Sequence, residues 1–139
     1  ELESADYVYI HDGARPFVDN FILMNAKQCV EQFEACAAGM PVKDTIKIVD
    51  EENFVAETPL RKYVWQIQTP QVFSYSLIRE AYERFYKEEM CISVTDDAMV
   101  VEHMMKKPVK LFEGSYENIK ITTPEDLQVA EELLKHRNF

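Results

Sequence analysis

Glycine is scarce in this sequence and occurs only as Gly13, Gly39 and Gly114. A glycine-rich loop that cradles phosphates is therefore excluded, because such a loop needs several glycines within a few residues. Long apolar runs are also missing, and none approaches the roughly 20 residues that a membrane-spanning helix needs. The acidic segment 1–6 has neither a basic region nor an apolar core, so we expect no signal peptide and no membrane partner.

Cysteine is equally sparse, and no Cys-x-x-Cys pair occurs among Cys29, Cys36 and Cys91. Their odd number and wide spacing predict buried free thiols in a reducing, cytoplasmic compartment rather than metal ligands. The three histidines are scattered and form no cluster with metal-ligand spacing.

Positive charge is in deficit, with 15 Lys and Arg against 25 Asp and Glu and a net charge of −10. This balance argues against general nucleic-acid binding, which requires a basic surface. It leaves open a phosphorylated small molecule, since a few well-placed cations can dominate the local field. The length of 139 residues predicts one domain that covers the whole chain, 1–139.

Apolar runs and helical periodicity alternate along the chain, which predicts an α/β fold. The expected strands cover 7–10, 35–42, 64–68 and 109–112. The expected helices cover 16–34, 74–88, 95–105 and a last segment that starts at Thr123. The unbroken apolar run 7–10 is typical of a central strand covered on both faces. Thr69-Pro70 is expected to stop the strand at 64–68.

Helix starts are marked by capping residues. Asp19 and Thr95 are plausible N-caps, and Thr123-Pro124 combines a threonine cap with proline at the first helical position. In the last helix, the spacing predicts a buried face made by Leu127, Ala130, Leu133 and Leu134.

The segment 45–64 differs from the rest. Two short apolar runs flank the polar turn 50–53, a pattern that predicts a β-hairpin inserted in the domain. We interpret this hairpin, called the arm from here on, as an element that grips a partner.

Four polar clusters follow the expected strands or open the expected helices, at 11–16, 43–45, 93–97 and 118–122. In open α/β sheets, ligands bind at such strand ends. Together the clusters offer a carboxylate for a hard cation or for sugar hydroxyls, and several cations for phosphates. Each has a simpler explanation by itself: Asp12 as a turn residue, Arg15 as a surface ion-pair partner, and Thr95-Asp96-Asp97 as a helix cap. Likewise Lys120 can reach to solvent, and Arg61 can be a solvated charge.

Taken together, five segments resemble the signature motifs of the 2-C-methyl-D-erythritol 4-phosphate cytidylyltransferases. They are His11-Asp12-Gly13-Ala14-Arg15-Pro16-Phe17, Pro41-Val42-Lys43-Asp44-Thr45-Ile46-Lys47, Gln68-Thr69-Pro70-Gln71-Val72-Phe73, Thr95-Asp96-Asp97-Ala98 and Asn118-Ile119-Lys120-Ile121-Thr122-Thr123-Pro124-Glu125-Asp126-Leu127. The resemblance spans essentially the whole chain. It implies a Rossmann-like nucleotidyltransferase fold, incomplete here, and a homodimer in which the arm reaches into the neighbouring subunit.

The resemblance also implies a reaction. The phosphate of methylerythritol phosphate attacks the α-phosphate of CTP and releases pyrophosphate with the help of Mg²⁺. By position, Lys120, Arg61 and Thr45 match catalytic residues, and Asp12 matches a carboxylate for the metal and the substrate hydroxyls. The substrate-binding set implied by the resemblance is Asp12, Arg15, Thr45, Arg61, Thr69, Thr95 and Lys120.

One departure from the family is large. Its members open with a glycine-rich loop that carries an Arg and a Lys for the CTP triphosphate, and three scattered glycines cannot form it. We therefore expect a fragment that does not turn over alone and whose strand 7–10 is left as an exposed apolar edge. Two alternatives remain at this point: a ribitol-5-phosphate cytidylyltransferase, and a non-catalytic dimerisation or binding module. Gly13-Ala14-Arg15 and Asp97-Ala98-Met99 favour the methylerythritol family over the ribitol family.

Overall fold

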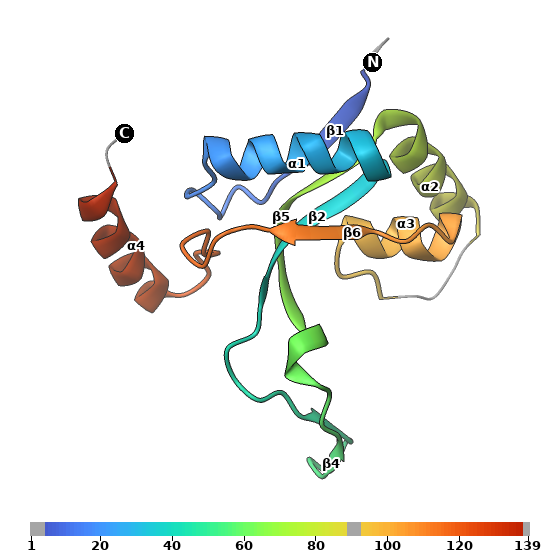
Figure 1. Cartoon of the computed structure of the whole chain (residues 1–139). Helices are drawn as coiled ribbons and strands as arrows, with labels where there is room; N and C mark the ends of the chain where they lie inside the picture. The colour runs from blue at the N-terminus through green and yellow to red at the C-terminus, as the bar shows by residue number, and fades with distance from the viewer. Residues whose placement is uncertain (1–4, 89–92, 138–139) are drawn as a thin grey trace.

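A mixed four-stranded sheet forms the centre of the protein (Figure 1). The computed structural model describes residues 5–88 and 93–137. The sheet has the order β1-β5-β2-β6, in which β1 and β2 run antiparallel to β5 and β6 runs parallel to β2. Its strands are β1 (Tyr7–Ile10), β5 (Trp65–Ser74), β2 (Ala35–Pro41) and β6 (Lys110–Glu113). The predicted α/β class is confirmed.

Helices cover both faces of this sheet: α1 (Asn20–Phe33) lies on one face, and α2 (Tyr75–Lys87) and α3 (Asp97–Met105) lie on the other. Successive residues of a strand point to opposite faces of the sheet, so each strand contributes side chains to two hydrophobic cores, one on each face. Cys36 and Val72 are paired across the sheet and pack with α1, whereas Ala35 and Phe73 pack with α2 and α3. All four are fully buried.

The strand 7–10 is not covered on both faces, contrary to what its apolar run indicates, and is an exposed edge as expected for a fragment. Among the residues that the structure describes, β1 lies at the edge of the sheet and pairs with β5 alone, and Tyr7 and Tyr9 stay 36% and 40% exposed. An apolar run alone cannot distinguish a central strand from an edge strand, because strand order depends on pairing with distant segments.

Thr69-Pro70 does not stop the strand, contrary to expectation, and β5 continues to Ser74. The ladder between β2 and β5 is irregular there, since Ala37 pairs with Gln71 and Gly39 pairs with Ile67. Three residues of β5 therefore lie opposite Ala38, and a proline at such a bulge removes no regular ladder hydrogen bond.

The N-caps of the helices are only partly as predicted. Asp19 caps α1 through a bond from the Ile22 amide, as expected. The cap of α3 is Asp96 and not Thr95, because the Asp96 side chain accepts from the Met99 amide at 2.9 Å. An aspartate and a threonine are both good caps, and here the aspartate lies at the position that reaches the first free amides.

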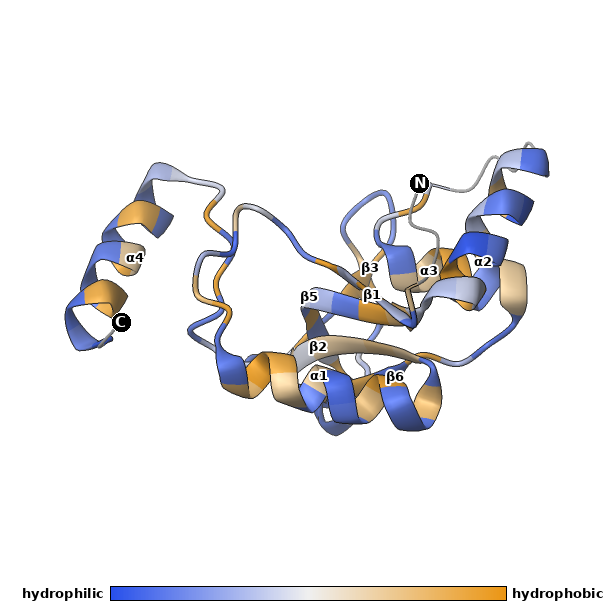
Figure 2. Ribbon diagram, turned by 90° about the horizontal axis from the view of Figure 1, so that it is seen from above, coloured by the Kyte–Doolittle hydropathy of each residue, from blue (hydrophilic) through white to orange (hydrophobic). Residues whose placement is uncertain are grey.

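The last helix, α4 (Pro124–His136), starts at the expected capping box of Thr123 and Asp126. Its expected buried face is mostly exposed: Ala130 is buried, but Leu127 and Leu134 are 54% and 46% exposed, and Leu133 is half-buried. Among the described residues, no other helix or strand packs along α4, which stands apart from the sheet in both views (Figure 1 and Figure 2). The pattern therefore predicted the helix correctly and its packing wrongly.

The arm projects away from the sheet (Figure 1). It contains the antiparallel pair β3 (Ile48–Val49) and β4 (Val55–Glu57), followed by the short 3₁₀ helix η1 (Arg61–Tyr63).

Cys29 and Cys36 are free thiols, half-buried and buried respectively, and Cys91 lies outside the described residues. Over the described ranges, no helix is long and apolar enough to cross a membrane.

Candidate functional site

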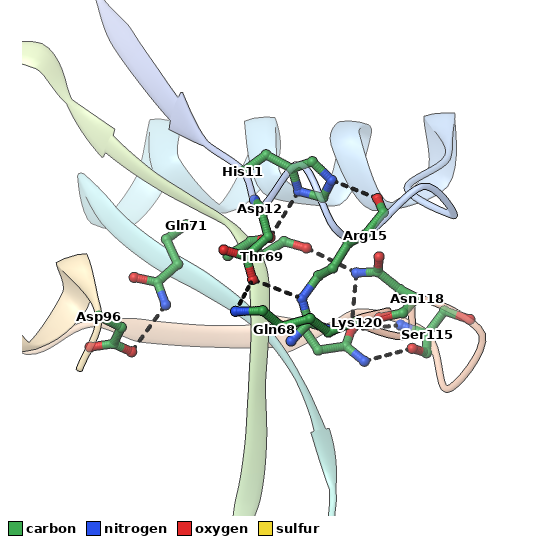
Figure 3. A network of polar contacts seen from close by, with 10 residues as sticks. All are labelled: His11, Asp12, Arg15, Gln68, Thr69, Gln71, Asp96, Ser115, Asn118 and Lys120. Atoms are coloured by element: carbon green, nitrogen blue, oxygen red, sulfur yellow. Dashed lines mark hydrogen bonds and ion pairs between the residues drawn. The ribbon is translucent and has the colours of Figure 1, made fainter. Parts of the chain in front are cut away.

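A cavity of about 360 Å³ opens where the end of β1, the middle of β5, the start of α3 and the loop after β6 meet. Five predicted site residues line it: Asp12, Arg15, Thr69, Thr95 and Lys120. They come from four segments far apart in the sequence. Figure 3 shows the polar contacts around Asp12, Arg15 and Lys120 that join these segments.

Asp12 is the centre of an ion-pair cluster. Its Oδ2 atom lies 3.3 Å from Arg15 Nε and 3.1 Å from Lys120 Nζ. Partial burial opposes ionisation, but the hydrogen bonds and charges of Lys120 and Arg15 outweigh it and hold the pKa of the Asp12 carboxyl below its ordinary value. The carboxylate therefore stays ionised through the neutral range, and two cations against one anion give these three residues a net positive charge. Such a cluster suits a phosphate. The carboxylates of Asp96 and Asp97 line the same cavity.

Thr69 connects Asp12 to His11. The Asp12 amide donates to Thr69 Oγ1 at 3.0 Å, and the same oxygen lies 2.9 Å from His11 Nδ1. His11 Nε2 lies 2.9 Å from the carbonyl oxygen of Arg15, which can only accept. The proton of a neutral His11 is therefore assigned to Nε2, and Nδ1 accepts from the Thr69 hydroxyl. Sequence reasoning did not single out His11, whose only signal was its place beside Asp12.

Gln71 fixes the start of α3 against β5. Its side chain is 2% exposed, accepts from the Ala98 amide at 2.8 Å, and donates to Asp96 Oδ2 at 3.0 Å. Asp96 is thereby used for structure, whereas the Thr95 hydroxyl contacts only Met99 Sδ at 3.8 Å among the described residues. Thr95 is thus held at the cavity with its hydroxyl available to a ligand.

Buried Asn118 ties the loop after β6 to the same region. Arg15 Nη1 donates to the Asn118 carbonyl at 2.7 Å, and Asn118 Nδ2 donates to the Thr69 carbonyl at 2.9 Å. Asn118 and Gln71 were not proposed as site residues. The only signal for them was their place inside the quoted motifs, because polar residues give no periodicity that reveals burial.

Thr45 and Arg61 do not line this cavity. Both belong to the arm, and Arg61 Nη1 donates to the carbonyl of Lys43 at 2.9 Å. A second hollow of about 500 Å³ adjoins the first and shares Arg15, Gln68 and Lys120 with it. The two cations therefore lie between two hollows, an arrangement that gives each access to groups bound on either side.

Three carboxylates among the described residues line the cavity, those of Asp12, Asp96 and Asp97, and Asp12 is the one predicted to hold a divalent cation. Within 5–88 and 93–137, no group of three His, Cys, Asp or Glu side chains could hold a metal ion. Both ion pairs of Asp12 use Oδ2, and Oδ1 makes no hydrogen bond to a described residue. One free carboxylate oxygen fits a hard cation that takes its other ligands from phosphates and water, as Mg²⁺ does in proteins.

The fold and this site define a class: an α/β domain of the nucleotidyltransferase kind, with a cluster of one carboxylate and two cations at its strand ends. The sequence model of the 2-C-methyl-D-erythritol 4-phosphate cytidylyltransferase family matches residues 2–136, and this chain belongs to that family. Proteins of that description are 50% identical over 135 residues in Lachnospira eligens and 52% identical over 133 residues in Caldanaerobacter subterraneus. These matches cover 97% and 96% of this chain, and 60% and 57% of those proteins.

Solved structures agree. The 4-diphosphocytidyl-2C-methyl-D-erythritol synthase of Anaerococcus prevotii matches with a TM-score of 0.86 at 38% identity, over 94% of this chain and 59% of that one. The Thermus thermophilus cytidylyltransferase matches with a TM-score of 0.82 at 32% identity, over 95% and 63%. This chain thus spans about 60% of the length of its relatives. The comparisons favour the methylerythritol family over a ribitol-5-phosphate enzyme and over a non-catalytic module.

Proposed function

We propose that this chain supplies the sugar-phosphate half of a cytidylyltransferase site that joins CTP to methylerythritol phosphate. The observation that carries the proposal is the Asp12–Arg15–Lys120 cluster at the cavity, with its net positive charge. A phosphate oxygen of the sugar phosphate attacks the α-phosphate of CTP, and pyrophosphate leaves. Such transfers require mainly positioning and positive charge near the phosphates, which Lys120 and Arg15 provide.

The remaining residues orient the sugar phosphate. Asp12, Thr69 and Thr95 line the cavity. The Asp12 carboxylate and the Thr95 hydroxyl suit the hydroxyls of a sugar alcohol, whereas the Thr69 hydroxyl is bonded to His11 and to the Asp12 amide. Nucleotidyltransferases generally use a divalent metal, and Asp12 Oδ1 would hold it together with substrate phosphates. When bound, Mg²⁺ neutralises the charge that develops on the phosphates.

The CTP triphosphate needs a separate holder. Glycines at 13, 39 and 114 alone build no glycine-rich loop, so this chain contains no such phosphate cradle. We expect the 139-residue chain to bind the sugar phosphate and not to turn over.

The free thiols of Cys29 and Cys36 support placing the protein in the reducing cytoplasm.

Calorimetric titration of the chain with methylerythritol 4-phosphate, ribitol 5-phosphate and CTP, each with Mg²⁺, tests the assignment. We expect binding of methylerythritol 4-phosphate, weaker binding of ribitol 5-phosphate, and no measurable binding of CTP. Tighter binding of ribitol 5-phosphate would contradict the substrate, and tight CTP binding would contradict the half-site. Sodium sulfate at equal ionic strength is the control for unspecific anion binding.

We further expect a homodimer that the arm (45–64) holds together. The arm exposes large apolar side chains, including Phe54 at 67%, Leu60 at 66% and Tyr63 at 74%. Contiguous exposed apolar surface is typical of an interface. A partner's arm would then bring Arg61 and Thr45 to the site, where the resemblance gives them catalytic roles.

Sedimentation equilibrium measures this association. The double variant Phe54→Ser/Tyr63→Ser is expected to be monomeric at concentrations where the unchanged chain is dimeric. Tyr86→Ser is the matched control, because Tyr86 is 75% exposed on α2, away from the arm, and its loss is expected to leave the dimer intact. A monomeric unchanged chain would contradict the proposed dimer.

A further inference from the structure

Two amide side chains link β5 to the loop that carries Lys120. Asn118 Nδ2 donates to Gln68 Oε1 at 3.2 Å, and Gln68 Nε2 donates to the Ser115 carbonyl at 2.7 Å. The same Gln68 oxygen accepts from the Ser115 amide at 3.3 Å. Gln68 is 9% exposed and Asn118 is 0% exposed, so the bond between their side chains is buried, whereas the two bonds to Ser115 are partly buried. We call this pair, Gln68 and Asn118, the amide clasp (Figure 3).

Gly114 makes room for the clasp. A Cβ atom at this position would lie 2.4 Å from Gln68 Oε1, a distance at which the Gln68 side chain must move. Gly114 has no positive φ, so its glycine is needed for space and not for backbone conformation. Its amide donates to the Gly39 carbonyl at 3.0 Å, which anchors the start of the loop to β2.

The clasp bears on both cations of the site. Asn118 presents its backbone carbonyl to Arg15 Nη1 at 2.7 Å. Two residues further, Lys120 places Nζ 3.1 Å from Asp12, and the next amide, Ile121, donates to the Ala14 carbonyl at 2.8 Å. Movement of Asn118 would therefore shift the guanidinium of Arg15 and the ammonium of Lys120 together.

One buried atom of the clasp is unsatisfied. Asn118 Oδ1 has no hydrogen-bond partner among the described residues. A buried carbonyl without a hydrogen-bond partner lowers the free energy of unfolding, so the Asn118 side chain is not the choice that stability alone would favour. Residues that sacrifice stability in this way are expected where position matters more than packing.

We propose that Gln68, Asn118 and Gly114 are positioning residues that set the location of Lys120 and Arg15 for the sugar phosphate. This inference rests on the proposed function, because it assumes that the two cations bind the substrate phosphate. Gln68 also borders the cavity, so its own contact with a ligand must be separated from its action through the loop. Gly114 does not line the cavity, which makes its substitution the cleaner probe.

The test is a double-mutant cycle on the affinity for methylerythritol 4-phosphate, measured by calorimetry with Mg²⁺. Gly114→Ala, Gln68→Met and Lys120→Ala are each expected to weaken binding about tenfold, as loss of a charged hydrogen bond does. Adding Lys120→Ala to Gly114→Ala is expected to cause little further loss, because a misplaced lysine contributes little. Val30→Ala, a fully buried position on α1 away from the site, controls for loss of stability and is expected to keep the affinity.

The outcomes separate the two proposals. If Lys120→Ala leaves the affinity unchanged, the proposed function fails. If Lys120→Ala weakens binding but Gly114→Ala does not, or if the two losses add fully, the positioning role is overturned. For variants that do not fold, amide hydrogen exchange on the unchanged chain gives a second readout. We expect the Ser115 amide to be protected by Gln68, and exchange as fast as in an unfolded peptide would also overturn the clasp.

Discussion

Replacing Lys120 by alanine is expected to lower the kcat/KM of cytidyl transfer by about 10²- to 10³-fold in the complete enzyme, as loss of one preorganised transition-state donor does elsewhere. Lys120 Nζ is 3.1 Å from Asp12 and lies where the two hollows meet. In the proposed reaction, negative charge grows on the transferring phosphate, so an ammonium there is expected to stabilise the transition state more than the ground state. The loss should therefore appear in kcat more than in KM.

Two further variants sharpen this experiment, in which pyrophosphate release is measured at saturating CTP. Lys120→Arg keeps the positive charge but replaces a compact ammonium by a planar guanidinium, and is expected to recover only part of the rate. Lys135→Ala is the matched control, because Lys135 pairs with Glu132 on the surface of α4. A Lys120→Ala variant with kcat within twofold of the unchanged enzyme would remove Lys120 from the reacting phosphates.

Phe73→Ala is expected to cause the largest loss of stability, about 3–5 kcal/mol of the free energy of unfolding. Phe73 is fully buried on β5 and packs in the core formed with α2 and α3. Its strand neighbours are Val8 on β1 and Ala35 on β2, so three strands and two helices surround the ring. These elements can collapse only partly into the cavity left by the ring. The total free energy of unfolding of a typical domain is only about 5–15 kcal/mol, so this variant is expected to be close to unfolding.

Urea denaturation followed by circular dichroism measures this loss. Phe21→Ala is the control, because Phe21 is also aromatic but is 66% exposed on α1, and its removal is expected to change stability by about 0.5 kcal/mol or less. Similar losses for the two variants would mean that the core between the sheet and α2–α3 is not where we describe it.

Local sequence signals succeeded where the cause of the structure is local. The Asp19 and Thr123 caps are set by side chains that accept from amides three residues further along the chain, and the sequence contains both partners. The prediction of Thr95 as the cap failed because either of two neighbouring residues could fill the role. Buried Gln71 on β5 donates to the Asp96 side chain and fixes it at the start of α3. The continuation of β5 past Pro70 failed for a similar reason, since the bulge opposite Ala38 depends on β2.

The sequence by itself determined the α/β class, the caps at Asp19 and Thr123, and the motifs that contain Asp12, Arg15, Thr69, Thr95 and Lys120. These follow from periodicity, from capping chemistry and from the order of short segments along the chain. Only the tertiary structure decided that α4 stands apart, and that Gln68 and Asn118 clasp the loop of Lys120. Strand order, burial and hydrogen bonds between residues 50 positions apart depend on which segments pack together in space. A local sequence pattern does not predict which segments these are.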